Sequence, residues 1–241
     1  MTLHLSHRLT FLLAVLLMLL FSGAARADAQ KRVDALVAYF DEIVFQTELS
    51  HAKAQTVITR WQEGLRISLH GRLSKQIQGF LQAHLSTVRS LTGVPIKQDQ
   101  ANPNITYFFA RQHEMTNVKG IDPEIIRRTA RGAACYFITF RKPEDRFRRA
   151  IIVVNIELPP ARVNHCLLEE TIQAMGLPND SNSFRPSIFS DLDMLFEPSR
   201  ADEILIRTLY DRRLKPGLPR AEALKAIRPI IADWDRQLPI R

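Results

Sequence analysis

The alternation of apolar and polar positions is clearest between residues 159 and 180. Two consecutive prolines stand where a helix tolerates them, in its first turn, and four apolar side chains then recur at roughly helical spacing. Gly176 occupies the position of a left-handed helix stop, and Pro178 prevents the helix from resuming. This stretch therefore predicts one helix with a buried face over residues 160–175, followed by a sharp turn.

β-Branched and alternating runs elsewhere predict the strands, and runs of helical period predict the remaining helices. Residues 57–71 alternate like two short strands around a turn at 62–64. A β-branched run at 150–156 leads directly into the 160–175 helix, which predicts an α+β fold with a mixed sheet and this helix packed across it. The other strands are expected at 95–97, 105–110 and 135–140, and the other helices at 30–50, 73–91 and 199–210.

The chain beyond residue 27 has no internal repeat, no low-complexity segment and no linker-like stretch. We therefore expect a single domain over residues 28–241. Its C-terminal part, residues 213–241, predicts a helical tail that packs on the outside of this domain.

The first 27 residues have the composition of a signal peptide. Arg8 and two histidines precede an apolar run at residues 11–21, and Ala25-Arg26-Ala27 supplies the small residues that signal peptidases recognise. We expect cleavage after Ala27 and export to the periplasm or the extracellular space. A transmembrane anchor fits less well, because this run is shorter than the roughly 20 residues that span a bilayer. No later stretch is apolar enough to span one.

Removal of residues 1–27 takes away Arg8 and Arg26 and no acidic residue, so the net charge falls from +8 to +6. Basicity in an exported protein suits anionic envelope polymers or lipids as neighbours. The lysines and arginines are dispersed among apolar segments, however, which favours a solvated surface over a nucleic-acid site. We therefore expect a peptide or an envelope polymer as partner and no nucleic acid.

Two cysteines, Cys135 and Cys166, remain after cleavage and would meet an oxidising compartment. A disulfide between them is the preferred interpretation, and two buried thiols are the alternative. By chain-entropy arithmetic, closing the loop between the two cysteines would stabilise the folded protein by about 3.6 kcal/mol. A metal site built on these two sulfurs is disfavoured, because no CxxC or Cys/His cluster accompanies them.

The EETIQ run inside the 160–175 helix places Glu169 and Gln173 one turn apart on one face. Zincin metallopeptidases use the same spacing in HExxH, where two histidines bind the metal and the intervening Glu is the general base. Against the longer metzincin form HExxHxxGxxH, this chain has EETIQAMGLPN, with Gly176 at the glycine position and Asn179 at the third ligand position. The stretch resembles a metzincin active-site helix and turn whose three histidines are replaced.

The chain is identified as a member of a bacterial secreted family of unknown function by its EExxQ…GLxND signature, which ends at Asn179 and Asp180. Metzincins continue with a Met-turn beneath the metal, often SIM, and a closing helix. Here Ser187-Ile188-Phe189 and a helix reaching Leu209-Tyr210 follow in that order, with Phe189 at the Met position. The resemblance implies a zincin-like α+β fold with a long helix in its N-terminal half, and a divergent metallopeptidase homologue without the usual histidine ligands.

The residues at or beside the ligand positions offer only oxygen donors: Glu169, Gln173, Asn179 and Asp180. Zinc prefers nitrogen and sulfur, whereas oxygen suits a hard cation such as calcium. Three interpretations stay open: a buried polar network, a metal-binding or hydrolytic site, and a ligand-binding cleft without catalysis. An envelope binding or assembly protein that holds an extended peptide along a sheet edge is the corresponding non-enzymatic function.

Glu170 stands at the general-base position and is the predicted catalytic residue of a hydrolytic site. A solvent-facing helix glutamate is the alternative. His165 precedes Glu169 by one turn, so it could add a nitrogen ligand as HxxxE. A partly exposed histidine in the first turns of the helix is the preferred interpretation of His165.

Overall fold

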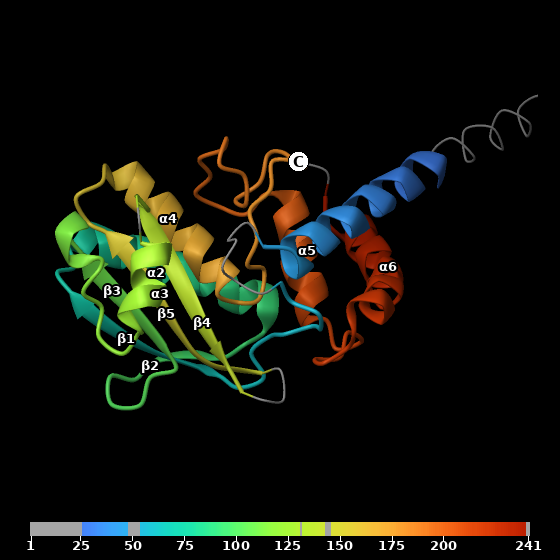
Figure 1. The fold of residues 1–241 in the computed structure, drawn as a ribbon. Coiled ribbons are helices and arrows are strands. Elements are labelled where there is room, and N and C mark those ends of the chain that lie inside the picture. Colours follow the sequence, from blue (N-terminus) through green and yellow to red (C-terminus); the bar gives the residue numbers. More distant parts are fainter. Residues whose placement is uncertain (1–25, 48–53, 131, 143–145, 240–241) are drawn as a thin grey trace, which may run out of the picture.

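The computed structural model describes residues 26–47, 54–130, 132–142 and 146–239. A five-stranded sheet with helices on both faces occupies one side of the molecule, and a group of helices occupies the other (Figure 1). A helix over residues 26–45 lies where a helix over 30–50 was predicted. The apolar run of the predicted signal peptide lies outside the described residues. No helix in the described part of the chain is long and apolar enough to cross a membrane.

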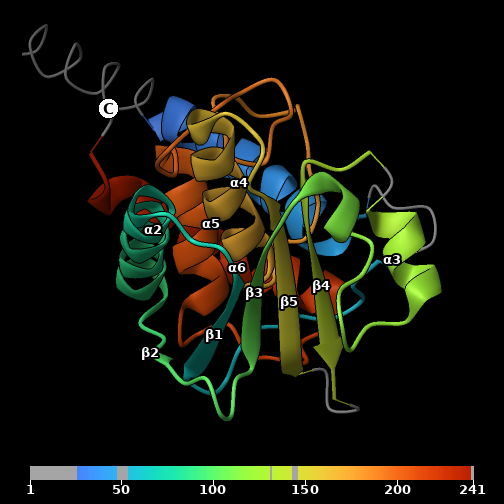
Figure 2. The same ribbon diagram turned by 90° about the vertical axis from the view of Figure 1, so that its left-hand side faces the viewer.

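The strands form one mixed sheet in the order β2-β1-β3-β5-β4 (Figure 2). β1 pairs in parallel with β2 and β3, and β3 pairs in parallel with β5. Among the described strands, β4 is the one that runs against the other four, and it forms one edge of the sheet. The expected α+β class with a mixed sheet is thus confirmed. The strands are β1 (Leu65–Gly71), β2 (Ile96–Gln98), β3 (Ile105–Ala110), β4 (Cys135–Arg141) and β5 (Phe147–Asn155).

Alternate residues of β5 supply two hydrophobic clusters on opposite faces of the sheet. Ile152 and Val154 belong to the larger cluster, which lies on the side of α2 (Lys75–Thr92) and α4 (Pro160–Gln173). Ile151 and Val153 belong to a smaller cluster with α3 (Pro123–Thr129) and the loop that follows the short 3-10 helix η1 (Gln112–Glu114). A strand that is apolar on both faces therefore accounts for the dense β-branched run in the sequence.

α2 and α4 pack side by side on one face of the sheet. α2 begins at Ser74, whose hydroxyl accepts a hydrogen bond from the Ile77 amide, and ends at Gly93 in the left-handed conformation. α4 begins at Pro160, a few residues after β5 ends at Asn155. The predicted strand-to-helix connection is confirmed, and it places α4 beside the edge formed by β4.

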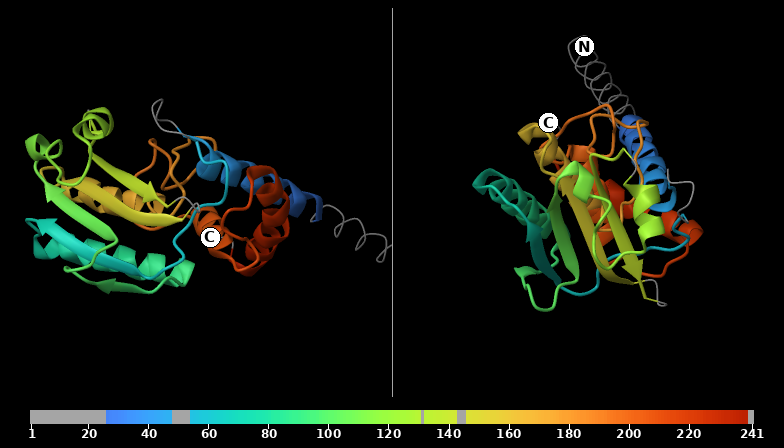
Figure 3. Two further views of the ribbon diagram at one scale, coloured as in Figure 1. Left: turned by 60° about the horizontal axis from the view of Figure 1, so that its bottom comes forward. Right: turned by 60° about the vertical axis from the view of Figure 1, so that its left-hand side comes forward.

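The C-terminal segment forms a helix at the periphery of the molecule (Figure 1). α6 (Arg220–Gln237) packs against α5 (Arg200–Tyr210), and its apolar face joins the larger core cluster. The 26–45 helix lies beside α6 (Figure 3), where Arg220 pairs with Asp41 at 2.6 Å and Arg32 with Asp235 at 3.2 Å. Contacts with two distant segments therefore bury one face of α6, and its opposite face stays exposed.

The predicted hairpin around residues 62–64 does not form. β1 exists, but the preceding segment pairs with the connection before α6 through an isolated bridge between Val57 and Pro219. The Ile58 amide donates to the Leu218 carbonyl at 2.9 Å. The alternation of this segment thus reflects burial against a partner distant in sequence, and the local turn makes no ladder.

The predicted disulfide between Cys135 and Cys166 is present, with 6.0 Å between the two Cα atoms. Cys135 is the first residue of β4, and Cys166 is a buried residue in the second turn of α4. The bond therefore fixes the beginning of the edge strand to the helix that lies beside it.

Replacing both Cys135 and Cys166 by alanine should lower the free energy of unfolding by about 2–4 kcal/mol, because an unbridged chain gains loop entropy when it unfolds. Urea unfolding of the oxidised protein and the double variant measures the difference. Addition of a reductant to the wild type should reproduce most of it. A difference below about 1 kcal/mol would show that the bond contributes little to stability.

Candidate functional site

α4 and the turn after it bring the motif residues to one end of the sheet. The helix buries Val163, Leu167 and Ile172 in the core, so its polar residues lie toward β4 and the following loop. Gly176 has a φ of 116°, and a Cβ atom there would lie 2.4 Å from the Thr59 carbonyl oxygen. Only glycine fits this turn, which sends the chain back alongside the helix.

Four of the predicted site residues line one small cavity of about 190 Å³. Glu169, Glu170 and Gln173 come from α4, and Asp180 comes from the loop after the Gly176 turn. The wall opposite α4 is formed by the first residues of β4 and the turn before it. The other lining residues are Thr129, Ala133, Ala134, Cys135, Tyr136, Phe137, Arg162, Pro178 and Asp191.

Gln173 connects the helix to the loop, because its side-chain amide donates a hydrogen bond to the Asp180 carboxylate. Gln173 is buried, with only 4% of its surface exposed. A buried amide is stable only when hydrogen-bonded, so this contact holds the loop against α4. The i, i+4 spacing therefore does place Glu169 and Gln173 at one cavity, with Asp180 beside Gln173.

Asn179 is not among the residues that line this cavity. Its side-chain amide donates to the Asp180 carbonyl at 2.9 Å, and its backbone amide donates to the Ile43 carbonyl at 3.2 Å. Asn179 thus joins the loop to the 26–45 helix. These contacts do not support the prediction that Asn179 binds a metal in the cavity.

His165 is buried rather than partly exposed, so that expectation was wrong. Its Nδ1 lies 2.9 Å from the Leu195 carbonyl oxygen, which can only accept, so Nδ1 carries a hydrogen. Its Nε2 lies 3.4 Å from a carboxylate oxygen of Glu169. Burial lowers the pKa of His165, which favours a bare Nε2 in this position. The Nε2–carboxylate contact is attractive only when a proton or another cation lies between the two atoms.

In the described part of the chain, no three side chains of His, Cys, Asp or Glu are grouped closely enough to bind a metal ion. The oxygen-donor set of Glu169, Gln173, Asn179 and Asp180 therefore stays a prediction. The fit is incomplete, because a hard cation takes six to eight oxygen ligands. Glu170 lines the cavity and is 6% exposed, so the alternative of a solvent-facing helix glutamate is wrong.

The loop after the turn is held by a second polar network, centred on Asp202 of α5. The Asp202 carboxylate accepts hydrogen bonds from the Ser187 hydroxyl at 2.6 Å, the Ile188 amide at 3.0 Å and the Ser199 amide at 2.8 Å. Tyr39 of the 26–45 helix contacts the same Ser187 hydroxyl at 2.6 Å. The run from Ser199 to Asp202 predicted a helix cap, but no local pattern indicated that Asp202 also anchors the Ser187–Phe189 segment.

A protein-family model matches residues 33–229, which is most of the chain and contains the whole site. The chain belongs to the DUF2927 family. That family is described as a protein of unknown function. The EExxQ…GLxND signature as a mark of the family stays a prediction. No curated protein matched the chain. Membership in DUF2927 carries no metallopeptidase activity with it, so the resemblance to metzincins rests on spacing alone.

Gln173→Ala should lower the free energy of unfolding by about 1–3 kcal/mol, because it leaves the Asp180 carboxylate without this donor. Gln76 is an exposed glutamine of α2, so Gln76→Ala is the matched control and should change stability by less than about 0.5 kcal/mol. Thermal or urea unfolding of the two variants measures both effects. Equal stability of the two variants would mean that the Gln173–Asp180 contact does not hold the loop.

The buried Asp202 predicts an unusual pH dependence of stability. Burial raises the pKa of Asp202 to about 6, above its value in the unfolded chain. The folded protein then binds more protons than the unfolded chain between about pH 4 and pH 6, so this residue's contribution to stability falls as the pH rises through that window. Asp202→Asn mimics the protonated form and should flatten this slope.

Urea unfolding of the wild type and Asp202→Asn at a series of pH values between 4.5 and 7.5 measures the difference in slope. The asparagine variant should gain stability relative to the wild type as the pH rises. If its stability instead falls further below that of the wild type with rising pH, the ionised Asp202 carboxylate stabilises the fold and the expected direction is wrong.

Proposed function

We propose that this protein is an exported, divergent metallopeptidase homologue whose cleft binds an extended polypeptide without cleaving it. The observation that carries the proposal is the outer edge of β4, which no described strand pairs with, beside the cavity of Glu169, Glu170 and Gln173. An extended chain gains affinity by adding a strand to such an edge, and adjacent cavities then select its side chains. Export is supported by the leader-like composition of residues 1–27 and by the disulfide between Cys135 and Cys166.

Hydrogen bonds on the two sides of β5 establish which backbone groups of β4 face outward. The Asn155 amide donates to the Ala134 carbonyl, so the alternate residues Tyr136 and Ile138 are the ones that bond to β5. The Ala150 amide donates to the Asn104 carbonyl on the opposite side, toward β3. The amide and carbonyl groups of the remaining β4 residues, Cys135, Phe137 and Thr139, therefore point away from the sheet.

The outward groups of Cys135 and Phe137 lie at the mouth of the cavity, since both residues also line it. A strand added along β4 would place alternate side chains over α4, where Glu169 and Gln173 lie. The Gln173–Asp180 hydrogen bond gives this floor a fixed internal contact. Because these polar groups already bond to each other, they favour a preformed binding surface over an exposed metal site.

Hydrolysis is the second candidate, and two observations favour it. Glu170 lines the cavity at the general-base position of the motif. The facing Nε2 of His165 and carboxylate of Glu169, 3.4 Å apart, are a nitrogen and an oxygen that a cation between them would attract. A hydrolase of this kind would lose activity in Glu170→Gln while remaining folded, and it would contain stoichiometric metal.

Peptide binding can be tested on an array of random-sequence heptapeptides probed with the fluorescently labelled protein. Thr139→Pro removes one outward amide of β4 and leaves the bonds to β5 in place, because proline is tolerated where the N–H faces away from the sheet. Thr139→Ala is the matched control, since it shortens the same side chain and keeps the amide. Thr139→Pro should weaken binding of the selected peptides at least tenfold, and Thr139→Ala should leave it within about twofold.

Two further measurements separate the candidates. Mass spectrometry of selected peptides after incubation should find them intact, and elemental analysis of the purified protein should find no stoichiometric zinc. Cleavage that Glu170→Gln abolishes would establish the hydrolase instead. A folded protein that selects no peptide, or a proline variant that binds as well as the alanine control, would contradict the proposed edge.

A further inference from the structure

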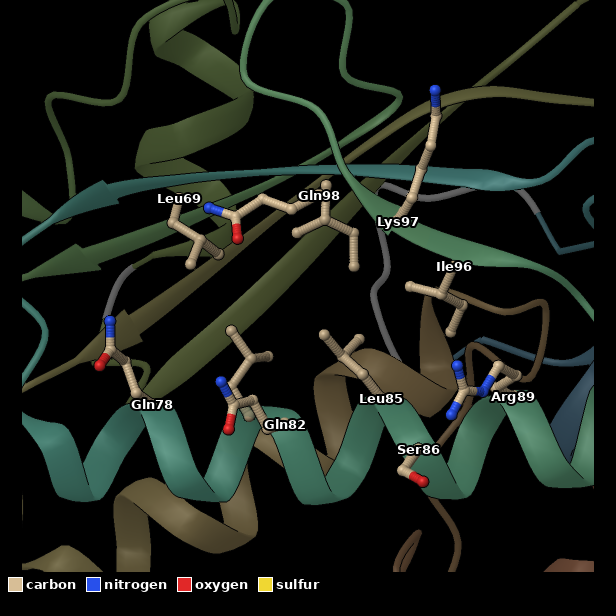
Figure 4. A pocket seen from close by; sticks show the side chains of 11 residues that line it. Leu69, Gln78, Gln82, Leu85, Ser86, Arg89, Ile96, Lys97 and Gln98 are labelled. Carbon is tan, nitrogen blue, oxygen red and sulfur yellow. The ribbon is translucent and has the colours of Figure 1, made fainter.

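A second hollow lies at the other edge of the sheet, between α2 and the strands β1 and β2 (Figure 4). Its volume is about 250 Å³. Leu69, Leu85 and Ile96 line it and are only partly buried, so they leave apolar surface open to solvent. Ile67 and Leu81 complete the apolar lining. The hollow shares no residue with the cavity beside β4.

Polar side chains of α2 mark the two ends of this hollow. Gln78 rises from the helix on the side of Leu69, and Arg89 lies in the last turn of α2 below Ile96 (Figure 4). Arg89 is exposed and forms no ion pair with any described residue. The neighbouring Lys97 pairs with Asp99 at 3.4 Å, and its ammonium points away from α2. Arg89 is therefore the cation that faces this hollow.

The dimensions favour a small, elongated ligand. Gln78 and Arg89 are eleven residues apart on α2, which is about 16 Å along the helix axis. The hollow between them is a slot that runs along α2. At roughly 25–30 Å³ per non-hydrogen atom, its volume of about 250 Å³ has room for about eight to ten such atoms.

We propose that this slot binds a single-chain amphiphile with an anionic end, a free alkyl carboxylate of about eight carbons. Its chain would lie along Leu69, Leu85 and Ile96, and its carboxylate would accept two hydrogen bonds from the Arg89 guanidinium. Removal of each methylene from water supplies affinity, and the arginine at one end fixes the direction in which the chain enters. The site is separate from the peptide-binding edge and does not depend on it.

Isothermal titration calorimetry with sodium octanoate, kept below its micelle concentration, measures binding to the full chain. Octanoate should bind saturably at one site. Neutral and cationic probes with the same alkyl chain, 1-octanol and octylammonium, should bind at least tenfold more weakly. Equal binding of all three probes would overturn the anionic preference, and absence of saturable binding by folded protein would overturn the site.

Three variants test the residues. Arg89→Gln should reduce octanoate affinity to that of 1-octanol, whereas Arg212→Gln, which removes the same charge from an exposed position in the turn after α5, should leave it within about twofold. Gln82→Trp places a large side chain in the slot and should abolish binding of every probe. Gln82 is exposed on α2, so circular dichroism should find this variant folded.

Retention of octanoate binding by folded Gln82→Trp would place the ligand elsewhere and overturn the proposal. Sedimentation provides a further check, because a second copy of the chain could also cover this face. A dimer that Gln82→Trp converts to monomer would show that the slot serves self-association and not ligand binding.

Discussion

The proposed site depends on which backbone groups of β4 bond to β5 and which point outward. Residues Tyr136 and Ile138 bond to β5, so the backbone groups of Cys135, Phe137 and Thr139 point outward. In the described sheet β4 is the last strand, and it runs antiparallel to the other four. The disulfide from Cys135 to α4 holds this edge beside the polar residues of the helix. An edge that natural proteins usually cover is thus kept in a fixed position over a cavity.

Two polar networks hold the loop that forms the remaining wall of that cavity. Gln173 bonds to Asp180 at its beginning, and Asp202 bonds to Ser187 and Ile188 further along. Tyr39 joins the second network, so the 26–45 helix supports a loop more than a hundred residues away. Because each network is buried or half-buried, protein contacts hold the loop in one conformation. A polar network that fixes the loop is therefore compatible with a cleft that binds a ligand.

The sequence predicted best what neighbouring residues determine. The 150–156 strand and the 160–175 helix carry strong periodic signals, and Gly176 fits its turn because a Cβ atom there would meet the Thr59 carbonyl. The predicted hairpin failed because Val57 pairs with Pro219, a partner that no local pattern reveals. His165 is buried by the Leu195 segment for the same reason. Spacing correctly placed Glu169 and Gln173 at one cavity, but it could not show that Asn179 turns to the 26–45 helix.

Residue-resolved amide hydrogen exchange of the free protein tests the open edge most directly. The amides of Tyr136 and Ile138 should exchange slowly, at rates near those of β5, because both bond across the sheet. The amides of Phe137 and Thr139 should exchange at least a hundredfold faster, because they face away from it. Uniform slow exchange along β4 would show that its outer side is already covered in the native protein, and it would contradict a site that binds an added strand.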